Sequence, residues 1–268
     1  MICPYCGSKT YWTEADFKGN EELRKKLLAY QMTAAENKEN DEGSDTSFAV
    51  AGTDSFFMQN GQRLNIGYMW KHIYDRMACY LAKDTVVYVF DEKNGADAFR
   101  SGLSKLRFPE ADNKLSRCFP ALKMEVALED GKCVLVFERR PNFYPAEMFA
   151  PWPSVHLAWV ISRMENICCA LEYSELEHRD ISGSSIWINP VTHEGALFGD
   201  WRNVRPLAAN TDLMALRKTA IALAEDTHKP IELYRFLNEK PGRDAFDDFS
   251  AWDKVIVNGF GGHRFVKM

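Results

Sequence analysis

Two carboxylates in the second half of the chain lie where they could do chemistry. Asp180 ends the triplet His178-Arg179-Asp180, and Asp200 follows a short apolar run. A carboxylate can accept a proton from a hydroxyl group, and carboxylate oxygens are the ligands that hard cations such as Mg²⁺ prefer. The order of these groups predicts a site that combines a base with a metal ligand. The alternative is that both are ordinary acidic residues of turns.

A second candidate site is the pair Cys3 and Cys6 near the N-terminus, in the stretch Cys-Pro-Tyr-Cys-Gly. This spacing is typical of a zinc knuckle. A tetrahedral site needs four ligands, and the sequence has no second Cys-x-x-Cys pair. Redox chemistry of the glutaredoxin kind is not expected, because only two residues precede the pair. Three interpretations remain open: a zinc site, a decayed zinc ribbon, or a site that another chain completes.

The first half of the chain has the pattern of strands. Residues 85–90 are β-branched and aromatic, which predicts a strand. Residues 124–128 and 133–137 flank an Asp-Gly turn and predict a hairpin. Residues 95–107 have helical spacing. The acidic stretch 36–62 has the composition of a linker.

The second half has the pattern of helices. Residues 155–173 are apolar on almost every side, which predicts a buried helix. A further helix is expected over 211–223. Strands followed by helices predict an α+β fold.

The bulk composition narrows the class of protein. The chain has 268 residues, 46% of them hydrophobic and 26% charged, as in ordinary globular proteins. A net charge of -5 gives no reason to expect nucleic-acid binding, and no apolar run reaches the roughly 20 residues that span a bilayer. No signal peptide is recognised, and seven Cys do not indicate a disulfide framework. We expect a cytoplasmic protein that does not bind a membrane.

The order of these segments resembles the protein kinases over about residues 60–268, most of all compact bacterial and phage kinase-like proteins. The resemblance implies that Asp180 is the base of the catalytic loop, with His178 as its anchor, and that Asp200 holds Mg²⁺ against ATP. Asp212 resembles the acid that opens a central helix and holds the backbone of the catalytic loop.

The nucleotide side of the resemblance is less complete. Glu138 resembles the end of the strand that enters the hinge, and the phosphate-covering loop is expected near Gly67, which stands alone where the family has three glycines. The positions of the family's Lys and its Glu partner fall on Tyr88 and near Ser101. Ser185 stands where a metal-binding Asn is expected, and we expect it to cap the loop.

We therefore expect a bilobal, protein-kinase-like α+β fold behind an N-terminal Cys knuckle. The leading hypothesis is a pseudokinase: a regulatory or nucleotide-binding module with weak or no phosphotransfer, bound to a protein partner. The alternatives are an active atypical Ser/Thr kinase with a displaced Lys, such as Lys93, and a small-molecule phosphotransferase. The expected parts are a knuckle (1–16), a short helix and flexible linker (17–62), a sheet-rich lobe (63–140) and a helical lobe (141–268).

Overall fold

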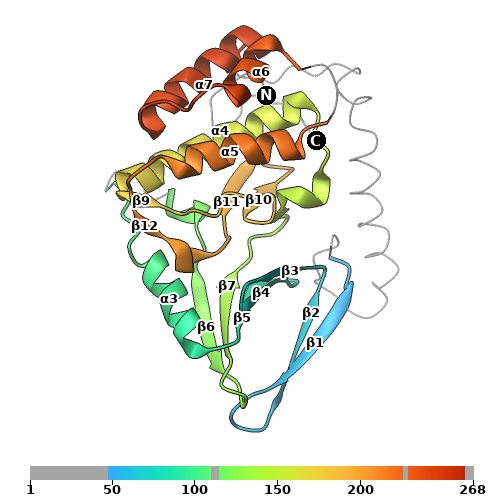
Figure 1. The fold of residues 1–268 in the computed structure, drawn as a ribbon. Coiled ribbons are helices and arrows are strands. Elements are labelled where there is room, and N and C mark those ends of the chain that lie inside the picture. Colours follow the sequence, from blue (N-terminus) through green and yellow to red (C-terminus); the bar gives the residue numbers. More distant parts are fainter. Residues whose placement is uncertain (1–47, 110–114, 226–228, 263–268) are drawn as a thin grey trace.

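The computed structural model describes residues 48–109, 115–225 and 229–262, which form a sheet-rich lobe and a helical lobe (Figure 1). Cys3, Cys6 and the knuckle expected over 1–16 lie outside these ranges. The two lobes agree with the expected α+β architecture.

The sheet-rich lobe holds a five-stranded antiparallel sheet in the order β3-β4-β5-β7-β6, with a separate hairpin, β1-β2. Its strands are β1 (Gly52–Phe57), β2 (Arg63–Tyr68), β3 (Trp70–Tyr74), β4 (Met77–Leu81), β5 (Thr85–Phe90), β6 (Leu122–Ala127) and β7 (Cys133–Glu138). The helix α3 (Lys93–Leu103) follows β5. The strand expected over 85–90 is confirmed as β5, and the hairpin expected from 124–128 and 133–137 is confirmed as the antiparallel pair of β6 and β7.

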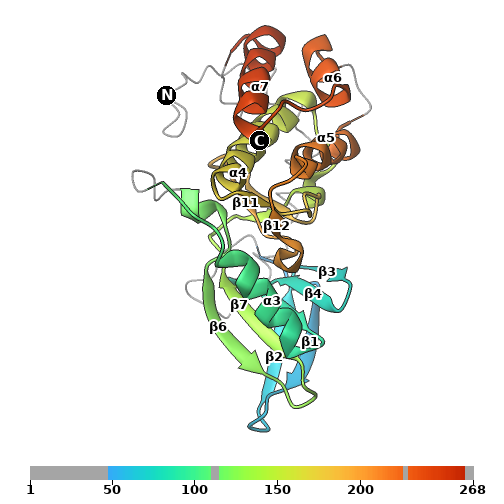
Figure 2. The same ribbon diagram turned by 60° about the vertical axis from the view of Figure 1, so that its left-hand side comes forward.

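The central strand β5 is apolar along nearly its whole length because both faces of the sheet are covered. Tyr88 and Phe90 face α3, where their rings pack on Phe99. Val87 and Val89 face the other way and belong to a small cluster under the β1–β2 hairpin. Figure 2 shows α3 and the hairpin on opposite faces of the sheet.

The β1–β2 hairpin differs from the linker expected there. Its residues alternate between partly buried and exposed, as a strand with one covered face requires. Leu64 and Ile66 of β2 turn towards the sheet. Most of the exposed positions are polar (Thr53, Ser55, Arg63 and Asn65), with Phe57 the exception, so the composition of this stretch resembled that of a linker.

A polar contact fixes the hairpin to the sheet. Asp54 Oδ2 accepts hydrogen bonds from Lys71 Nζ (2.6 Å) and from the Tyr80 hydroxyl (2.8 Å). Lys71 holds the pKa of the Asp54 carboxyl below its ordinary value. The ammonium group of Lys71 is thereby engaged on the outer face of the sheet.

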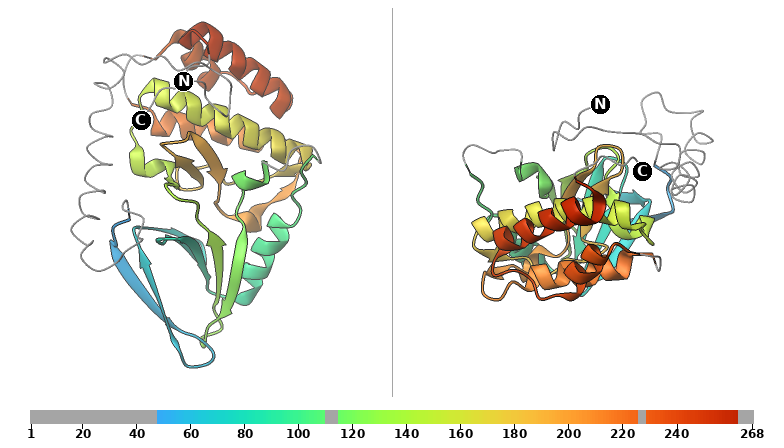
Figure 3. Two further views of the ribbon diagram at one scale, coloured as in Figure 1. Left: turned by 180° about the vertical axis from the view of Figure 1, so that it is seen from behind. Right: turned by 90° about the horizontal axis from the view of Figure 1, so that it is seen from above.

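The helical lobe is built around α4 (Ser154–Tyr173), which packs against α7 and α5 (Figure 3). The buried helix expected over 155–173 is confirmed. The other elements of this lobe are β8 (Tyr144–Pro145), η3 (Ala146–Phe149), β9 (Leu176–Glu177), β10 (Ile186–Asn189), β11 (Glu194–Leu197), η4 (Trp201–Asn203), β12 (Arg205–Pro206), α5 (Thr211–Leu223), α6 (Ile231–Asn238) and α7 (Ala245–Phe260). A single-turn helix, η2 (Leu115–Cys118), lies between α3 and β6. No helix in the described ranges is long and apolar enough to cross a membrane.

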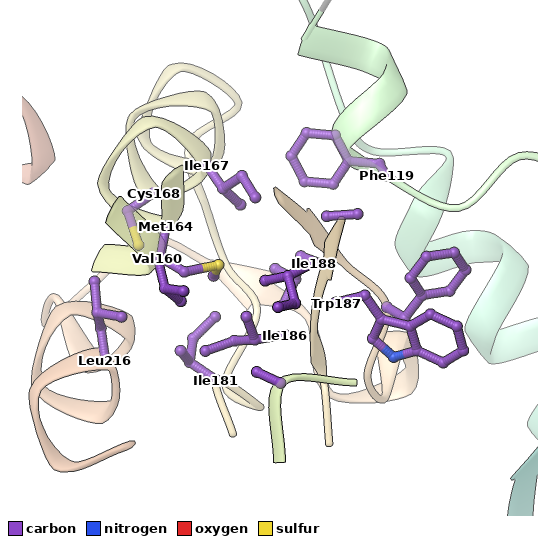
Figure 4. Packing of buried hydrophobic residues seen from close by; sticks show 14 of the residues in the cluster. Phe119, Val160, Met164, Ile167, Cys168, Ile181, Ile186, Trp187, Ile188 and Leu216 are labelled. Atoms are coloured by element: carbon purple, nitrogen blue, oxygen red, sulfur yellow. The ribbon is translucent and has the colours of Figure 1, made fainter. Parts of the chain in front are cut away.

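The strand β10 ties the loop before it to the core. Ile186 and Ile188 point towards Met164 and Val160 on α4, whereas Trp187 points to the opposite side (Figure 4). This alternation follows from the period of two in a strand. The loop 178–185 is thus anchored by β10 on one side and by β9 on the other.

Candidate functional site between the lobes

The loop 178–185 is held in shape by Asp212 at the start of α5. Asp212 accepts hydrogen bonds from the backbone N–H of His178 (2.6 Å) and of Arg179 (2.7 Å). The expectation that Asp212 holds this loop is confirmed. Burial raises the pKa of the Asp212 carboxyl.

His178 is an internal support of the loop. Its ring is fully buried, lies 4.5 Å from the Trp201 ring, and its Nδ1 is 3.0 Å from the carbonyl oxygen of Asp180. Burial lowers the pKa of His178, which favours the neutral imidazole. The position fits the anchoring role expected for this residue.

The structure brings Asp180 and Asp200 together. The backbone N–H of Asp200 donates to Asp180 Oδ2 (2.9 Å), and the Ser182 hydroxyl donates to Asp180 Oδ1 (3.0 Å). Gly199 makes this approach possible, since a Cβ there would lie 2.7 Å from the His178 ring and 2.8 Å from Asp180. Gly199 also has φ of +62°, which favours glycine.

The carboxylate of Asp200 is fully engaged by its own segment. Oδ1 accepts from the backbone N–H (3.0 Å) and Nε (2.8 Å) of Arg202. Oδ2 accepts from Arg202 Nη2 (2.8 Å) and Asn203 Nδ2 (2.9 Å). A carboxylate offers about four lone-pair positions, so this arrangement does not fit a metal ion at Asp200.

The serines of the loop bond to one another. Ser185 Oγ accepts from the backbone N–H of Ser182 (2.7 Å), and Ser182 Oγ accepts from the N–H of Ser185 (3.2 Å). This is the capping arrangement expected for Ser185, which is fully buried. Its hydroxyl closes the loop and is not directed at Asp200.

The sheet-rich lobe contributes Tyr88 to this site. The Tyr88 side chain is fully buried, and its hydroxyl donates to the carbonyl oxygen of Gly199 (3.1 Å). The α3 residue that packs on Tyr88 is Phe99, at 4.7 Å between ring centroids. Ser101, the residue expected to face this position, is exposed instead, because the buried side of α3 is formed by Ala96, Phe99 and Gly102.

Gly67 lies elsewhere than expected. It is in β2, paired with Thr53 of the hairpin. The turn above the site is the one between β3 and β4, made by Asp75 and Arg76, of which Arg76 has φ of +56°. The difference arises because the hairpin adds two strands before β3, so the turn falls later in the sequence than Gly67.

A row of aromatic side chains on β3 fills the space beside the loop. The Trp70 ring stacks on His72 at 5.7 Å, and His72 meets Tyr74 at 4.5 Å. Trp70 also meets the fully buried Trp187 edge-on at 5.9 Å. Burial, with the nearby carboxylate of Asp180, raises the pKa of Tyr74.

Two further residues singled out in the sequence are exposed. Glu138, at the end of β7, is exposed, and its N–H donates to the carbonyl oxygen of Ala121. Lys93 is exposed at the start of α3. In the described ranges, the guanidinium group bonded to Asp200 is that of Arg202, and no lysine bond to this carboxylate is seen.

Sequence reasoning missed Arg202, Trp70 and Tyr74 as parts of the site. The signal for Arg202 was present, because an arginine two residues after an acidic group can fold back onto it. The row of Trp70, His72 and Tyr74 was not recognised, because alternate aromatic residues in a strand indicate only that one face is covered and not what covers it.

Metal binding finds no support in the described part of the chain, where no cluster of three or more His, Cys, Asp and Glu could hold an ion. The zinc expected at Cys3 and Cys6 lies outside these ranges.

Comparison of the sequence with protein families and with curated proteins finds no match. Solved structures do match. The BubR1 kinase domain aligns with a TM-score of 0.53 at 9% identity, covering 88% of this chain and 93% of that one. The ROP18 kinase domain, in complex with AMP-PNP and sucrose, aligns with a TM-score of 0.52 at 11% identity, covering 85% and 91%.

A third match is WbdD, with a TM-score of 0.50 at 14% identity over 71% of this chain. The chain spans about half the length of WbdD, since 46% of that protein is covered. At these identities the likeness concerns the fold. The chain therefore has a protein-kinase-like fold, with a sheet-rich lobe and a helical lobe.

Proposed function

We propose that this chain is a pseudokinase: a kinase-like scaffold that binds a protein partner and does not transfer phosphate. The observation that carries the proposal is Tyr88. By the resemblance it stands where the kinases have the phosphate-binding lysine; its side chain is fully buried, and its hydroxyl donates to the carbonyl oxygen of Gly199. A neutral phenol cannot neutralise phosphate charge as an ammonium group does.

The acidic side of the site supports the same proposal. Phosphoryl transfer depends on positioning and on neutralising charge across the phosphates. Asp200 accepts four hydrogen bonds from Arg202 and Asn203, and Asp180 accepts one from the backbone of Asp200. In this arrangement the Asp200 carboxylate has no lone-pair position left for a metal ion, and each oxygen of Asp180 already accepts one hydrogen bond, from the backbone of Asp200 or from the Ser182 hydroxyl. We propose that the protein has no requirement for ATP and Mg²⁺.

The test is a phosphotransfer assay on the purified chain with radiolabelled ATP, Mg²⁺ or Mn²⁺ and generic protein substrates. Wild type should give no more label than a heat-denatured sample, and a thermal-shift titration with ATP and Mg²⁺ should leave its Tm unchanged. Binding at a hundred times Kd would stabilise the fold by about 2.7 kcal/mol, which is readily measured.

An active atypical kinase is the second candidate, because Asp180 and Asp200 do meet at one site and Asp212 holds the loop. It would require Arg202 to swing away from Asp200. Robust labelling that disappears in both Asp180→Asn and Asp200→Ala would establish this candidate and end the pseudokinase proposal.

A further inference from the structure

One arginine connects both lobes at the site. Arg202 forms two bonds to Asp200, through Nε to Oδ1 and through Nη2 to Oδ2, each of 2.8 Å. Its Nη2 also donates to the backbone carbonyl oxygen of Asp75 (2.7 Å). Asp75 belongs to the turn between β3 and β4, so a single guanidinium group joins the helical lobe to the sheet-rich lobe.

A divalent cation at the position of this guanidinium group would have the same two effects. It would neutralise the Asp200 carboxylate and attract the carbonyl oxygen of Asp75 in the turn between β3 and β4. A guanidinium group is planar, always charged, and matches a carboxylate in bidentate geometry. The backbone of η4 sets the geometry, because Asp200 also caps the N–H of Arg202.

We infer that Arg202 acts as a built-in cation that latches the two lobes together without nucleotide or metal. The latch rests on the proposed function, since an active enzyme would have to release Asp200 from Arg202.

Two other bonds across the lobes support the latch. The Tyr88 hydroxyl donates to the carbonyl of Gly199 at the back of the site. Trp70 Nε1 donates to Glu147 Oε1 (2.9 Å). Trp70, the first residue of β3, therefore attaches this strand to the helical lobe, and Arg202 attaches the turn that follows the last residue of β3.

The consequence is a single closed arrangement. In many kinase-like proteins, closure around ligands sets the relation between lobes. Here the same relation is fixed by side chains of the chain itself. A partner protein would meet one pre-formed surface across both lobes, independent of the nucleotide supply.

The experiment is hydrogen exchange of the full chain, followed at the backbone amides of residues 70–81. Arg202→Ala should raise exchange of the turn amides at least tenfold, because the turn loses its bond to the helical lobe. Arg205→Ala is the matched control: it removes an exposed arginine three residues later and should leave these amides unchanged. Amides of α4, read in the same samples, report whether each variant is folded.

Two further measurements test whether the charge of Arg202 alone is sufficient and whether a nucleotide contributes. Arg202→Lys keeps the positive charge but cannot make the bidentate contact to Asp200, so the exchange rate of the turn amides should lie between those of wild type and Arg202→Ala. ATP with Mg²⁺ should leave wild-type exchange unchanged. Unchanged turn exchange in Arg202→Ala, with α4 protected, would refute the latch even if the protein proves inactive. Protection of the wild-type turn by ATP and Mg²⁺ would also refute it, whereas phosphotransfer alone would count against the proposed function.

Discussion

Two bidentate arginine–aspartate pairs in the described part of the chain have different roles. Arg217 on α5 and Asp248 on α7 lie 2.7 Å apart at both contacts, with side chains 6% and 1% exposed. Arg202 and Asp200, two residues apart in one segment, are 18% and 6% exposed. The first pair joins two helices in the core. In the second pair, the arginine engages the Asp200 carboxylate of the site and also bonds to the backbone of Asp75 in the sheet-rich lobe.

The difference shows how one chemical motif acts in two settings. A fully buried pair leaves a bare charge when either partner is removed, so the fold depends on it. Asp248 additionally accepts the N–H of Gly242 (2.7 Å). The pair at the site borders solvent, and its loss should affect the relation of the lobes more than global stability.

The largest effect is expected from Arg217→Met, which leaves Asp248 charged and buried without its partner. We expect a loss of about 3–5 kcal/mol in the free energy of unfolding, measured by urea denaturation. Arg202→Met should cost less than Arg217→Met, because Asp200 keeps the hydrogen bonds from the backbone N–H of residue 202 and from Asn203 Nδ2. Equal losses for the two variants would break the comparison. The double variant Arg217→Met, Asp248→Leu should recover part of the loss, because no unpaired charge remains.

The next effect is expected at Asp212, which supports the loop that both site acids depend on. Asp212→Asn replaces one of two acceptor oxygens with a donor and leaves a buried N–H of His178 or Arg179 unpaired. We expect a loss of about 2–3 kcal/mol, with faster exchange of the loop amides. Asp91→Asn, an exposed acid after β5, is the matched control and should be neutral within about 0.5 kcal/mol. A neutral Asp212→Asn would mean that the loop holds its shape without α5.

Much of the fold could be predicted from the sequence because the signals were local. The apolar run of α4 predicts a buried helix, and the β-branched residues of β5 and β7 predict strands, without any information from distant residues. The approach of Asp180 and Asp200 followed from the order of segments in a resembling family. Asp212 was found in the same way.

What could not be predicted depends on contacts between distant segments. The bond from Tyr88 to Gly199 spans 111 residues, and no local pattern records it. The bond from Arg202 to Asp75 spans 127 residues. The hairpin β1–β2 was not recognised in the sequence because its buried residues, such as Leu64 and Ile66, alternate with exposed residues that are mostly polar.

A smaller effect, dependent on pH, sharpens the contrast between the two pairs. Glu165 on α4 lies beside the pair of Arg217 and Asp248, and burial raises the pKa of its carboxyl to about 9 from 4.5. The folded state therefore holds a proton that the unfolded state releases above pH 4.5. Stability from this group is lost as pH rises towards 9, by about 1.4 kcal/mol for each pH unit.

We expect wild type to lose about 2 kcal/mol between pH 6.5 and 8 from this group, measured by urea denaturation at each pH. Glu165→Gln cannot titrate and should flatten the dependence. The buried His156 and His193, with pKa values lowered to about 4 and about 3, have the opposite effect, which fades as pH rises above about 6.5, and the comparison of wild type with Glu165→Gln cancels their contribution. A slope unchanged by Glu165→Gln would show that Glu165 is not the group that titrates.

The smallest effect is expected at Tyr88, where the site meets the sheet-rich lobe. Tyr88→Phe keeps the aromatic packing on Phe99 and removes only the hydroxyl, leaving the carbonyl of Gly199 without this donor. The expected loss is about 1 kcal/mol, with slightly faster exchange of the amides that follow Gly199.

Tyr88→Lys restores the residue type typical of kinases at a fully buried, aromatic position, and should cost more than Tyr88→Phe because a buried ammonium group needs a partner. A Tyr88→Lys variant that is as stable as wild type and binds ATP would contradict this expectation. It would mean that the site can accept a nucleotide although Arg202 is bonded to Asp200.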